Sequence, residues 1–238
     1  MNKKICVIIP TYNEALNIRH VITEIKKCIK SEIVVIDDGS KDNTAKIAKL
    51  ENVVVITCKK NKGSGKAIQK GLRYVLAKNF QIAIQLDGDG QHNPCDIAKL
   101  LKKMIKKNAD VVIGSRFIKK TNYKAPIERF ISIKILSWIL RITFGIRITD
   151  PTSGFRAINK TTMRFLLDHY SLPYPEALSI AALTSYNFKV EEASVTMRPR
   201  FNGKSSLNTF KGFKCLLFNI IEIINYRFKT IFVPKNHL

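Results

Sequence analysis

Residues 81–92, Gln-Ile-Ala-Ile-Gln-Leu-Asp-Gly-Asp-Gly-Gln-His, decide the predicted fold class of this chain. Residues 81–86 form an alternating, mainly apolar run, and the glycines after it are typical of a tight turn that ends a buried strand. Open α/β sheets bind ligands at the carboxyl ends of their strands, which is where Asp87 and Asp89 would lie. Two neighbouring carboxylates repel each other, and a divalent metal ion beside a diphosphate would relieve this repulsion. A solvated Asp-Gly turn is the alternative interpretation.

Short β-branched runs alternate with helical patterns over residues 4–115. The apolar runs cover residues 5–9, 33–36, 53–57, 82–86 and 111–113. Apolar side chains at helical spacing occur near residues 14–29, 42–50, 65–78 and 96–107. This alternation predicts an α/β fold with a mostly parallel sheet and helices on both faces.

Two later helical patterns are richer in aromatic and basic residues. They cover residues 127–144 and about residues 208–228, and each has a broad apolar surface interrupted by Lys and Arg. Basic amphipathic helices suit a membrane interface, although packing against a sheet is the commoner use of this pattern. No run approaches the roughly 18 apolar residues of a spanning helix, so we expect the chain not to be an integral membrane protein by itself.

The chain of 238 residues is strongly basic, with 41 Lys and Arg against 18 Asp and Glu and a net charge of +23. Such a charge favours polyanions, including nucleic acid, anionic lipid and phosphorylated substrates, although solvated surface lysines are an alternative source of part of it. The five cysteines are odd in number and scattered, and Cys6 and Cys58 lie in strand-like runs. They show no metal-ligand spacing, and a reducing cytosol is the expected compartment.

Polar motifs follow four of the predicted strands. They are Pro-Thr-Tyr-Asn-Glu at residues 10–14, Asp-Asp-Gly-Ser at residues 37–40, the Asp87 turn, and Gly-Ser-Arg-Phe at residues 114–117. In a parallel sheet these four strand ends lie along one edge, so their side chains can line a single cleft.

Two further motifs complete the pattern, Asn-Lys-Gly-Ser-Gly-Lys at residues 61–66 and Asp-Pro-Thr-Ser-Gly-Phe-Arg at residues 150–156. With these six motifs in order, the chain resembles the family 2 glycosyltransferases of GT-A fold. Within them it resembles the polyprenyl-phosphate sugar transferases of the dolichol-phosphate mannose synthase type, over about residues 4–207. The resemblance implies a GT-A (Rossmann-like) glycosyltransferase domain over residues 1–207. Residues 208–238 would form an amphipathic C-terminal helix and tail at the membrane interface.

In the family that the chain resembles, the first two motifs hold the nucleotide, and a basic loop lies near the diphosphate. The expected nucleotide-sugar-binding residues are therefore Pro10, Tyr12, Glu14, Ile36, Asp38, Asp87, Gly88, Arg200 and Lys204. An aromatic ring can pack on a base, and a carboxylate can accept hydrogen bonds from a base or a ribose. Loop packing for Tyr12 and a helix-dipole role for Glu14 are the alternatives. Asp37 is expected to face inward and to hold its turn.

The resemblance also implies a site for Mg²⁺ or Mn²⁺. Its ligands would be Asp89 and Gln91, with Asp87 contacting the ribose or assisting the metal. Hard oxygen ligands suit these ions, which stabilise the charge that develops on a departing diphosphate. His92 is expected to have a structural role rather than to act as a base.

Arg116 and Arg129 are the expected contacts of the acceptor phosphate, and Arg116 could instead hold the donor diphosphate. An interfacial helix charge is the alternative for Arg129. A lipid phosphate is already anionic, so it needs no base, and its direct attack would invert the anomeric centre. For an acceptor hydroxyl, Glu176 is the candidate base, unless it only begins a helix. The expected catalytic residues are Asp89, Arg116 and Glu176.

Together these observations predict an inverting glycosyltransferase that moves a sugar from a nucleotide-diphosphate donor to polyprenyl phosphate. The alternative is an enzyme of the same fold that acts on a saccharide or lipid-linked hydroxyl. A nucleic-acid-binding module is disfavoured, because it leaves the strand-end carboxylates unexplained and no recognition helix is evident. We expect the protein to be cytoplasmic and peripherally associated with the inner face of the membrane, where a separate membrane-spanning protein is a candidate partner. The residues do not fix the donor base or sugar.

Overall fold

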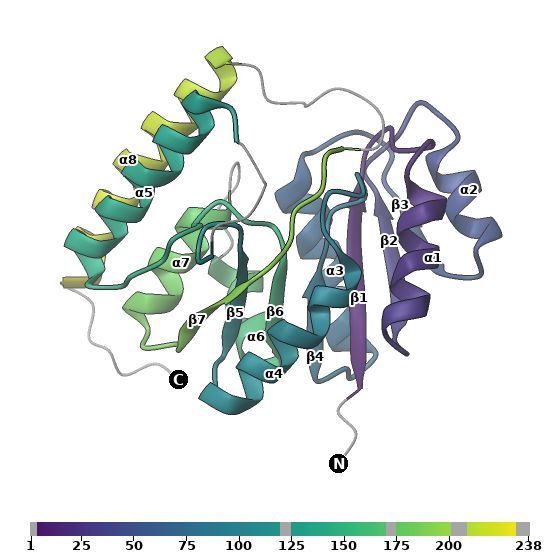
Figure 1. The fold of residues 1–238 in the computed structure, drawn as a ribbon, viewed down its shortest axis with the longest axis horizontal. Helices are drawn as coiled ribbons and strands as arrows, with labels where there is room; N and C mark the ends of the chain where they lie inside the picture. The colour runs from purple at the N-terminus through teal and green to yellow at the C-terminus, as the bar shows by residue number, and fades with distance from the viewer. Residues whose placement is uncertain (1–3, 120–124, 170–174, 201–208, 232–238) are drawn as a thin grey trace.

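The structure is a computed structural model that describes residues 4–119, 125–169, 175–200 and 209–231. These residues form a seven-stranded sheet with helices on both faces (Figure 1). The strands are β1 (Ile5–Thr11), β2 (Glu32–Asp37), β3 (Val54–Thr57), β4 (Ile82–Gln85), β5 (Val111–Ser115), β6 (Arg156–Asn159) and β7 (Val190–Ser194). Their order across the sheet is β3-β2-β1-β4-β6-β5-β7.

The directions of the strands bring several strand ends to one edge of the sheet. β1 pairs in parallel with β2 and β4, β2 with β3, and β5 with β7. β6 is antiparallel to both β4 and β5, so β4 and β5 run in the same direction as each other. The carboxyl ends of β1, β2, β4 and β5 therefore share one edge, and the segment before β6 arrives there too. The predicted mostly parallel α/β sheet is confirmed.

Two apolar clusters form the core, one on each face of the sheet. On one face pack α1 (Ile18–Cys28), α2 (Thr44–Leu50) and α4 (Ile97–Lys107), which follows the short 3₁₀ helix η1 (Pro94–Asp96). On the other face pack α3 (Ser64–Ala77), α6 (Lys160–His169) and α7 (Pro175–Ser185). In α1 the buried positions are Ile18, Val21, Ile22 and Ile25, which is the three- and four-residue spacing expected of a helix with one apolar face.

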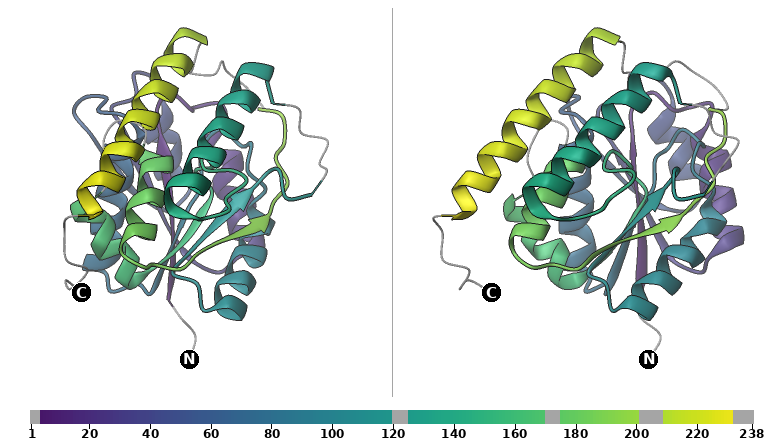
Figure 2. Two further views of the ribbon diagram at one scale, coloured as in Figure 1. Left: turned by 90° about the vertical axis from the view of Figure 1, so that its left-hand side faces the viewer. Right: turned by 60° about the vertical axis from the view of Figure 1, so that its left-hand side comes forward.

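The two aromatic-rich patterns form a pair of helices, α5 (Ile127–Phe144) and α8 (Thr209–Ile231). They pack against each other and against α7, and they run side by side in the same direction (Figures 1 and 2). Each helix also keeps large apolar side chains exposed, among them Ile127, Ile131, Trp138 and Ile142 on α5, and Phe213, Leu217, Ile221, Ile224 and Phe228 on α8. Packing on the body and an exposed apolar stripe therefore coexist in both helices. Among the described helices, none is both long enough and apolar enough to cross a bilayer.

The structure contains a disulfide, which was not predicted from the scattered cysteines and the expected reducing compartment. Cys28, the last residue of α1, and Cys95, in η1, form a disulfide across a sequence separation of 67 residues. The bond ties α1 to the segment that follows the Asp87 turn. Cys6 and Cys58 are buried free thiols, as predicted from their apolar surroundings.

Candidate active site

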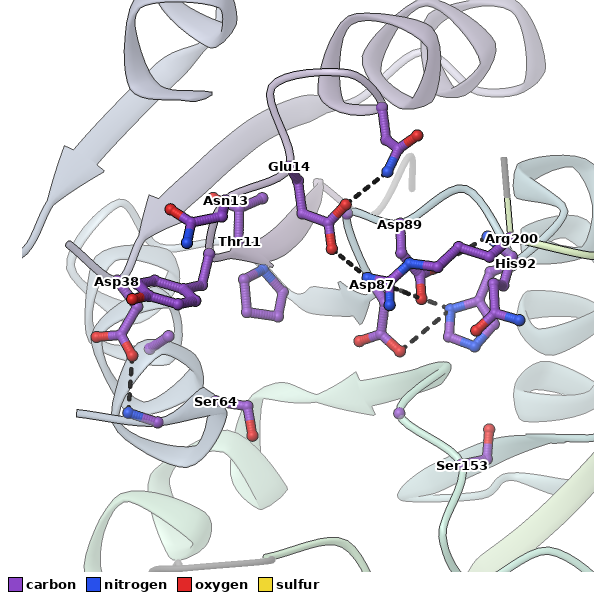
Figure 3. A pocket seen from close by; sticks show the side chains of 18 of the residues that line it. Thr11, Asn13, Glu14, Asp38, Ser64, Asp87, Asp89, His92, Ser153 and Arg200 are labelled. Atoms are coloured by element: carbon purple, nitrogen blue, oxygen red, sulfur yellow. Dashed lines mark hydrogen bonds and ion pairs between the residues drawn. The ribbon is translucent and has the colours of Figure 1, made fainter. Parts of the chain in front are cut away.

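A pocket of about 720 Å³ lies at the carboxyl edge of the sheet (Figure 3). Its walls come from the ends of β1, β2, β4 and β5, the first turns of α3 and α5, and the segments before β6 and after β7. The predicted site residues that line it are Pro10, Tyr12, Glu14, Asp38, Asp87, Gly88, Asp89, Gln91, Arg116, Arg129 and Arg200. Residues that are distant in the sequence therefore converge on one cleft, as the order of the motifs predicted.

The turn after β4 presents two carboxylates to this pocket. Asp89 Oδ1 accepts a hydrogen bond of 3.0 Å from the backbone N–H of Gln91, which fixes the turn. Loss of hydration inside the pocket raises the pKa of both Asp87 and Asp89, and the charge of Asp87 raises that of Asp89 further. Nearby arginines, Arg129 first among them, oppose the shift at Asp87. The site is thus built to favour a bound cation between or beside the two carboxylates.

These residues fit a divalent metal ion. A Cβ on Gly154 would lie 3.1 Å and 3.2 Å from the two carboxylate oxygens of Asp87, so the glycine leaves space for a carboxylate that faces the pocket. Among the described residues, no group of three or more His, Cys, Asp or Glu side chains is arranged around a common point. Mg²⁺ commonly takes one or two protein carboxylates and completes its shell with water and substrate phosphate. The two carboxylates of Asp87 and Asp89 and the amide oxygen of Gln91 are oxygen ligands of this kind and number.

His92 is a neutral, structural residue. Its side chain is buried and stacks on Phe155 at 5.1 Å between ring centroids. Its Nδ1 atom accepts a hydrogen bond of 3.3 Å from the backbone N–H of Asp87, and burial lowers the pKa of His92 to about 4. The ring therefore supports the turn that contains Asp87, in agreement with the structural role expected for it.

Glu14 contacts an arginine in the pocket wall (Figure 3). One carboxylate oxygen of Glu14 pairs with Nη2 of Arg200, and the other accepts a hydrogen bond of 2.6 Å from Asn17. The same Nη2 atom lies 3.8 Å from Asp89 Oδ2. Burial raises the pKa of Glu14, although the bonds from Asn17 and Arg200 oppose this rise. Arg200 is thus held between Glu14 of the first motif and Asp89 of the turn after β4, near the place expected for the diphosphate.

Arg116 does not have the arrangement expected of a phosphate clamp. Its side chain is only 3% exposed, and its Nε and Nη2 atoms donate to the carboxylate of Asp150 at 2.5 Å and 2.6 Å. Nη2 also donates to Thr152 at 3.0 Å. The bidentate edge of the guanidinium is therefore occupied by a protein carboxylate, and the prediction that it grips a ligand phosphate needs correction. Arg116 instead holds the 150–152 segment against the end of β5.

Arg129 also lines the pocket, and its contacts with the described residues differ from those of Arg116. It lies in the first turn of α5 and lines the pocket, where its positive charge acts on Asp87. It makes no hydrogen bond or ion pair with any side chain or backbone group in the described part of the chain. An arginine placed in this way can bind a phosphate without first breaking a protein contact.

The nucleotide end of the pocket is formed by the first two motifs and the 61–64 loop. Tyr12 is 39% exposed there. Asp38 accepts hydrogen bonds from the backbone N–H groups of Lys62 at 2.9 Å and Gly63 at 2.7 Å, so it also orders the 61–64 loop. Asp37 is buried and accepts a bond of 3.3 Å from the backbone N–H of Ser40, as expected for a residue that holds its turn.

Among the residues that the structure describes, two predicted site residues, Ile36 and Glu176, do not line the pocket. Ile36 is fully buried in the core beneath α3, because helices cover both faces of β2. Glu176 begins α7 and does not line the pocket, and burial raises its pKa although Arg156 opposes this. Lys204 lies outside the described residues.

Several pocket residues were missed at the sequence level. Thr152, Ser153 and Gly154 line the pocket from the segment before β6, and Met197 does so from the segment after β7. The 150–156 motif was recognised, but its individual residues were given no role. Asn13, also in the lining, has a left-handed backbone with φ of 56°, which marks a tight turn after β1.

Residues 6–166 match the sequence profile described as Glycosyl transferase family 2. The chain belongs to this family. The match covers nearly all of the strand-helix alternation and all six motifs.

The chain is 32% identical to the UDP-N-acetylglucosamine–dolichyl-phosphate N-acetylglucosaminyltransferase of Methanococcus voltae, over 90% of this chain and 93% of that protein. It is 30% identical to the undecaprenyl-phosphate mannosyltransferase of Micrococcus luteus, over 82% of this chain and 78% of that protein. It is 34% identical to the dolichol-phosphate mannosyltransferase of Pyrococcus furiosus, over 86% of this chain and 59% of that protein.

A solved structure with a similar fold is glucosyl-3-phosphoglycerate synthase from Mycobacterium tuberculosis, in complex with Mn²⁺, uridine diphosphate and glucosyl-3-phosphoglycerate. The TM-score is 0.68 and the identity 19%, over 98% of this chain and 81% of that one. At this identity the likeness shows the fold alone, and it supports the GT-A-like architecture of this family member.

Proposed function

We propose that the protein transfers a sugar from a nucleotide-diphosphate donor to a polyprenyl phosphate, with inversion of the anomeric centre. The observation that carries the proposal is the pairing of Asp87 and Asp89 with Arg129 and Arg200 in one pocket. The two carboxylates suit the divalent metal ion that accompanies the diphosphate of a nucleotide sugar. Of the two arginines, Arg200 suits the donor diphosphate and Arg129 suits the phosphate of the acceptor. The names of the relatives from three organisms describe sugar transfer to dolichyl or undecaprenyl phosphate, which agrees with this chemistry.

The donor nucleotide is proposed to bind between the 10–14 segment and the 61–64 loop. There Tyr12 would pack on the base, and Asp38 would accept from base or ribose groups. Mg²⁺ or Mn²⁺ would be held by Asp89 and Gln91 with the help of Asp87, and when bound it would neutralise charge on the departing nucleoside diphosphate. The glucosyl-3-phosphoglycerate synthase in complex with Mn²⁺ and uridine diphosphate is a precedent in the same fold.

Arg129 is proposed to bind the acceptor phosphate. A phosphate oxygen is already anionic at neutral pH, so it can attack the anomeric carbon without a protein base. The attack forms the new oxygen–carbon bond on the face opposite the departing diphosphate, and this geometry inverts the sugar. Glu176, the candidate base for a hydroxyl acceptor, does not line the pocket, and this position favours the phosphate acceptor.

The exposed stripes of α5 and α8 are proposed to contact the membrane that holds the isoprenoid tail. Lys134, Arg141, Lys214 and Arg227 lie on the same two helices and are exposed or partly exposed, which suits anionic lipid headgroups at the cytoplasmic face. Arg129 lies in the first turn of α5, so an acceptor phosphate bound there would be next to this surface. A separate membrane-spanning partner could dock on the same helices.

The test is direct transfer. The protein is incubated with Mn²⁺, a short polyprenyl phosphate in detergent micelles and radiolabelled UDP-N-acetylglucosamine, GDP-mannose or UDP-glucose in turn. We expect one donor to give a labelled lipid that mild acid releases, and no product from the unphosphorylated polyprenol or after treatment with a chelator. Transfer to a saccharide hydroxyl, with polyprenyl phosphate inert, would support the alternative acceptor class and reject the proposal.

A further inference from the structure

The segment that follows β7 holds the turn that carries the candidate metal ligands. The backbone N–H of Arg198 donates to the carbonyl oxygen of Gln91 at 2.8 Å, and the Gln91 side-chain amide lies 3.5 Å from the carbonyl oxygen of Arg198. His92 and Met197 form an isolated antiparallel bridge beside this pair. The two segments therefore form a short antiparallel ladder. One segment contains Gln91, a candidate metal ligand, and the other leads to Arg200 two residues later.

The side chain of Arg198 links this ladder to helix α1. Its Nη1 atom lies 2.8 Å and 2.9 Å from the two carboxylate oxygens of Glu24, which also lies 3.5 Å from His20. Its Nη2 atom donates to Asn93 Oδ1 at 3.1 Å. Asn93 Oδ1 in turn accepts from the backbone N–H of Cys95 and caps η1. One guanidinium thus joins α1, the residue after His92 and the strand segment that leads to Arg200.

Arg198 is not in a position to contact a ligand, because it does not line the pocket and its side chain faces α1. We propose that Arg198 is a positioning residue that fixes the metal-binding turn and Arg200 relative to each other. The inference rests on the function proposed above. Groups that orient metal ligands are worth about 10- to 100-fold in metal affinity. Arginine is suited to the task, since its rigid planar fork holds two acceptors in a fixed geometry, whereas a lysine ammonium is a point charge on a flexible stem.

The experiment measures Mn²⁺ binding rather than turnover. Free Mn²⁺ is followed by electron paramagnetic resonance, with and without uridine diphosphate, in the wild-type protein and in Arg198→Ala, Arg198→Lys and Glu24→Ala. The control is Arg19→Ala, which removes an ion pair between α1 and Glu51, at 3.0 Å, that involves no residue of the turn. Binding is measured at a temperature at which circular dichroism shows every variant to be folded.

We expect Arg198→Ala to raise the Kd for Mn²⁺ about 10-fold, in line with other groups that orient ligands. Arg198→Lys should recover only part of this loss, and Glu24→Ala should raise the Kd by about 3-fold, as for a partly exposed ion pair. Arg19→Ala should bind as the wild type does. An unchanged Kd in Arg198→Ala, or complete recovery in Arg198→Lys, would overturn the inference while leaving the proposed function standing. No binding by the wild type would overturn the metal role and the inference together.

Discussion

Gly154 stands against the carboxylate of Asp87, so that a methyl group on its Cα would come within 3.1 Å of Oδ1 and 3.2 Å of Oδ2. The backbone of Gly154 is not left-handed, so alanine is conformationally allowed there and the effect of Gly154→Ala is confined to the carboxylate. We expect the side chain of Asp87 to turn away and the Kd for Mn²⁺ with uridine diphosphate to rise about 10-fold, the scale seen when ligand orientation is lost. Calorimetric titration measures this.

The matched control for that substitution is Gly212→Ala in α8. A Cβ at Gly212 meets no atom within 4 Å, and its φ is not positive. Alanine is favoured over glycine inside a helix by about 1 kcal/mol, so this variant should bind metal normally and be slightly more stable. Equal metal affinities in the two variants would contradict the close-approach role of Gly154.

Asp89→Asn should raise the stability of the metal-free protein and abolish transfer. Burial and the charge of Asp87 raise the pKa of Asp89, so its folded-state pKa lies above its unfolded value. Ionisation of Asp89 therefore lowers the free energy of unfolding. This loss is absent below the ordinary pKa range of aspartate and becomes complete as the pH rises past the folded-state pKa. The asparagine keeps the acceptor for the Gln91 N–H without the charge. Thermal unfolding without metal should show a higher Tm for the variant at pH 7 and no difference at about pH 3.

A lower Tm for Asp89→Asn at neutral pH would contradict this picture of a strained carboxylate pair. Normal transfer by Asp89→Ala would rule out the metal role of the residue.

Substitution of Arg116 should lower stability, whereas substitution of Arg129 should weaken substrate binding. Arg116→Ala leaves Asp150, which is fully buried, without its main counter-charge, and breaking a buried ion pair in this way costs about 3–5 kcal/mol. Arg129→Ala removes a side chain with no hydrogen bond or ion pair to the described residues and should change stability by less than about 0.5 kcal/mol. Its expected effect is a higher KM for polyprenyl phosphate. Urea unfolding measures the stability of each variant, and steady-state kinetics measure its KM for polyprenyl phosphate. Similar unfolding curves for both variants would contradict the different roles given to the two arginines.

The apolar stripes of α5 and α8 should carry the binding to membranes. Trp138 on α5 and Phe213 on α8 are exposed by 62% and 58%. Replacing both with serine should reduce co-sedimentation with phosphatidylglycerol vesicles by at least about 10-fold, because each buried side chain contributes roughly 1.5–3 kcal/mol. Ile105→Ser is the control, since Ile105 is 71% exposed on α4, on another side of the molecule (Figure 1). Equal losses in the two variants would point to a general effect of surface hydrophobicity.

The Cys28–Cys95 disulfide should stabilise the fold substantially. A bond that closes a loop of 67 residues contributes about 4 kcal/mol in the chain-entropy model. We expect Cys28→Ser, or reduction with dithiothreitol, to lower the free energy of unfolding on that scale. Thiol titration of the unreduced, denatured protein should find the three thiols of Cys6, Cys58 and Cys215. Five reactive thiols would show that the bond does not form.

The architecture and the place of the site follow from the sequence, because both depend on local patterns. Alternating strands and helices predict a parallel sheet, and its strand ends must then share an edge, which places Asp38, Asp89 and Arg116 together. The strand β6 is not predicted from the sequence, because it is only four residues long and begins at the last residue of the 150–156 motif.

What the sequence could not supply was the choice of partner at long range. Nothing near Arg116 indicates that Asp150, 34 positions away, would occupy its guanidinium. The disulfide likewise joins two unremarkable positions across 67 residues. Ile36 was assigned to the nucleotide from its motif, but its side chain packs in the core because β2 is covered on both faces. Such pairings depend on the three-dimensional arrangement and have no local signal.

The reversed strand β6 has a consequence for protein engineering. Because β6 is antiparallel to β4 and β5, it begins at the edge of the sheet where those two strands end. The 150–155 segment that precedes β6 therefore lies beside the pocket, and the wall that it forms comes from the part of the chain after residue 113. Most residues proposed for the donor thus precede residue 113, whereas Arg129 and the 150–155 wall follow it, and Arg200 is the donor-side residue that also lies in the later part of the chain. A chimaera that takes residues 1–113 from this protein and the remainder from a relative should keep the donor preference of the first parent while adopting the acceptor of the second.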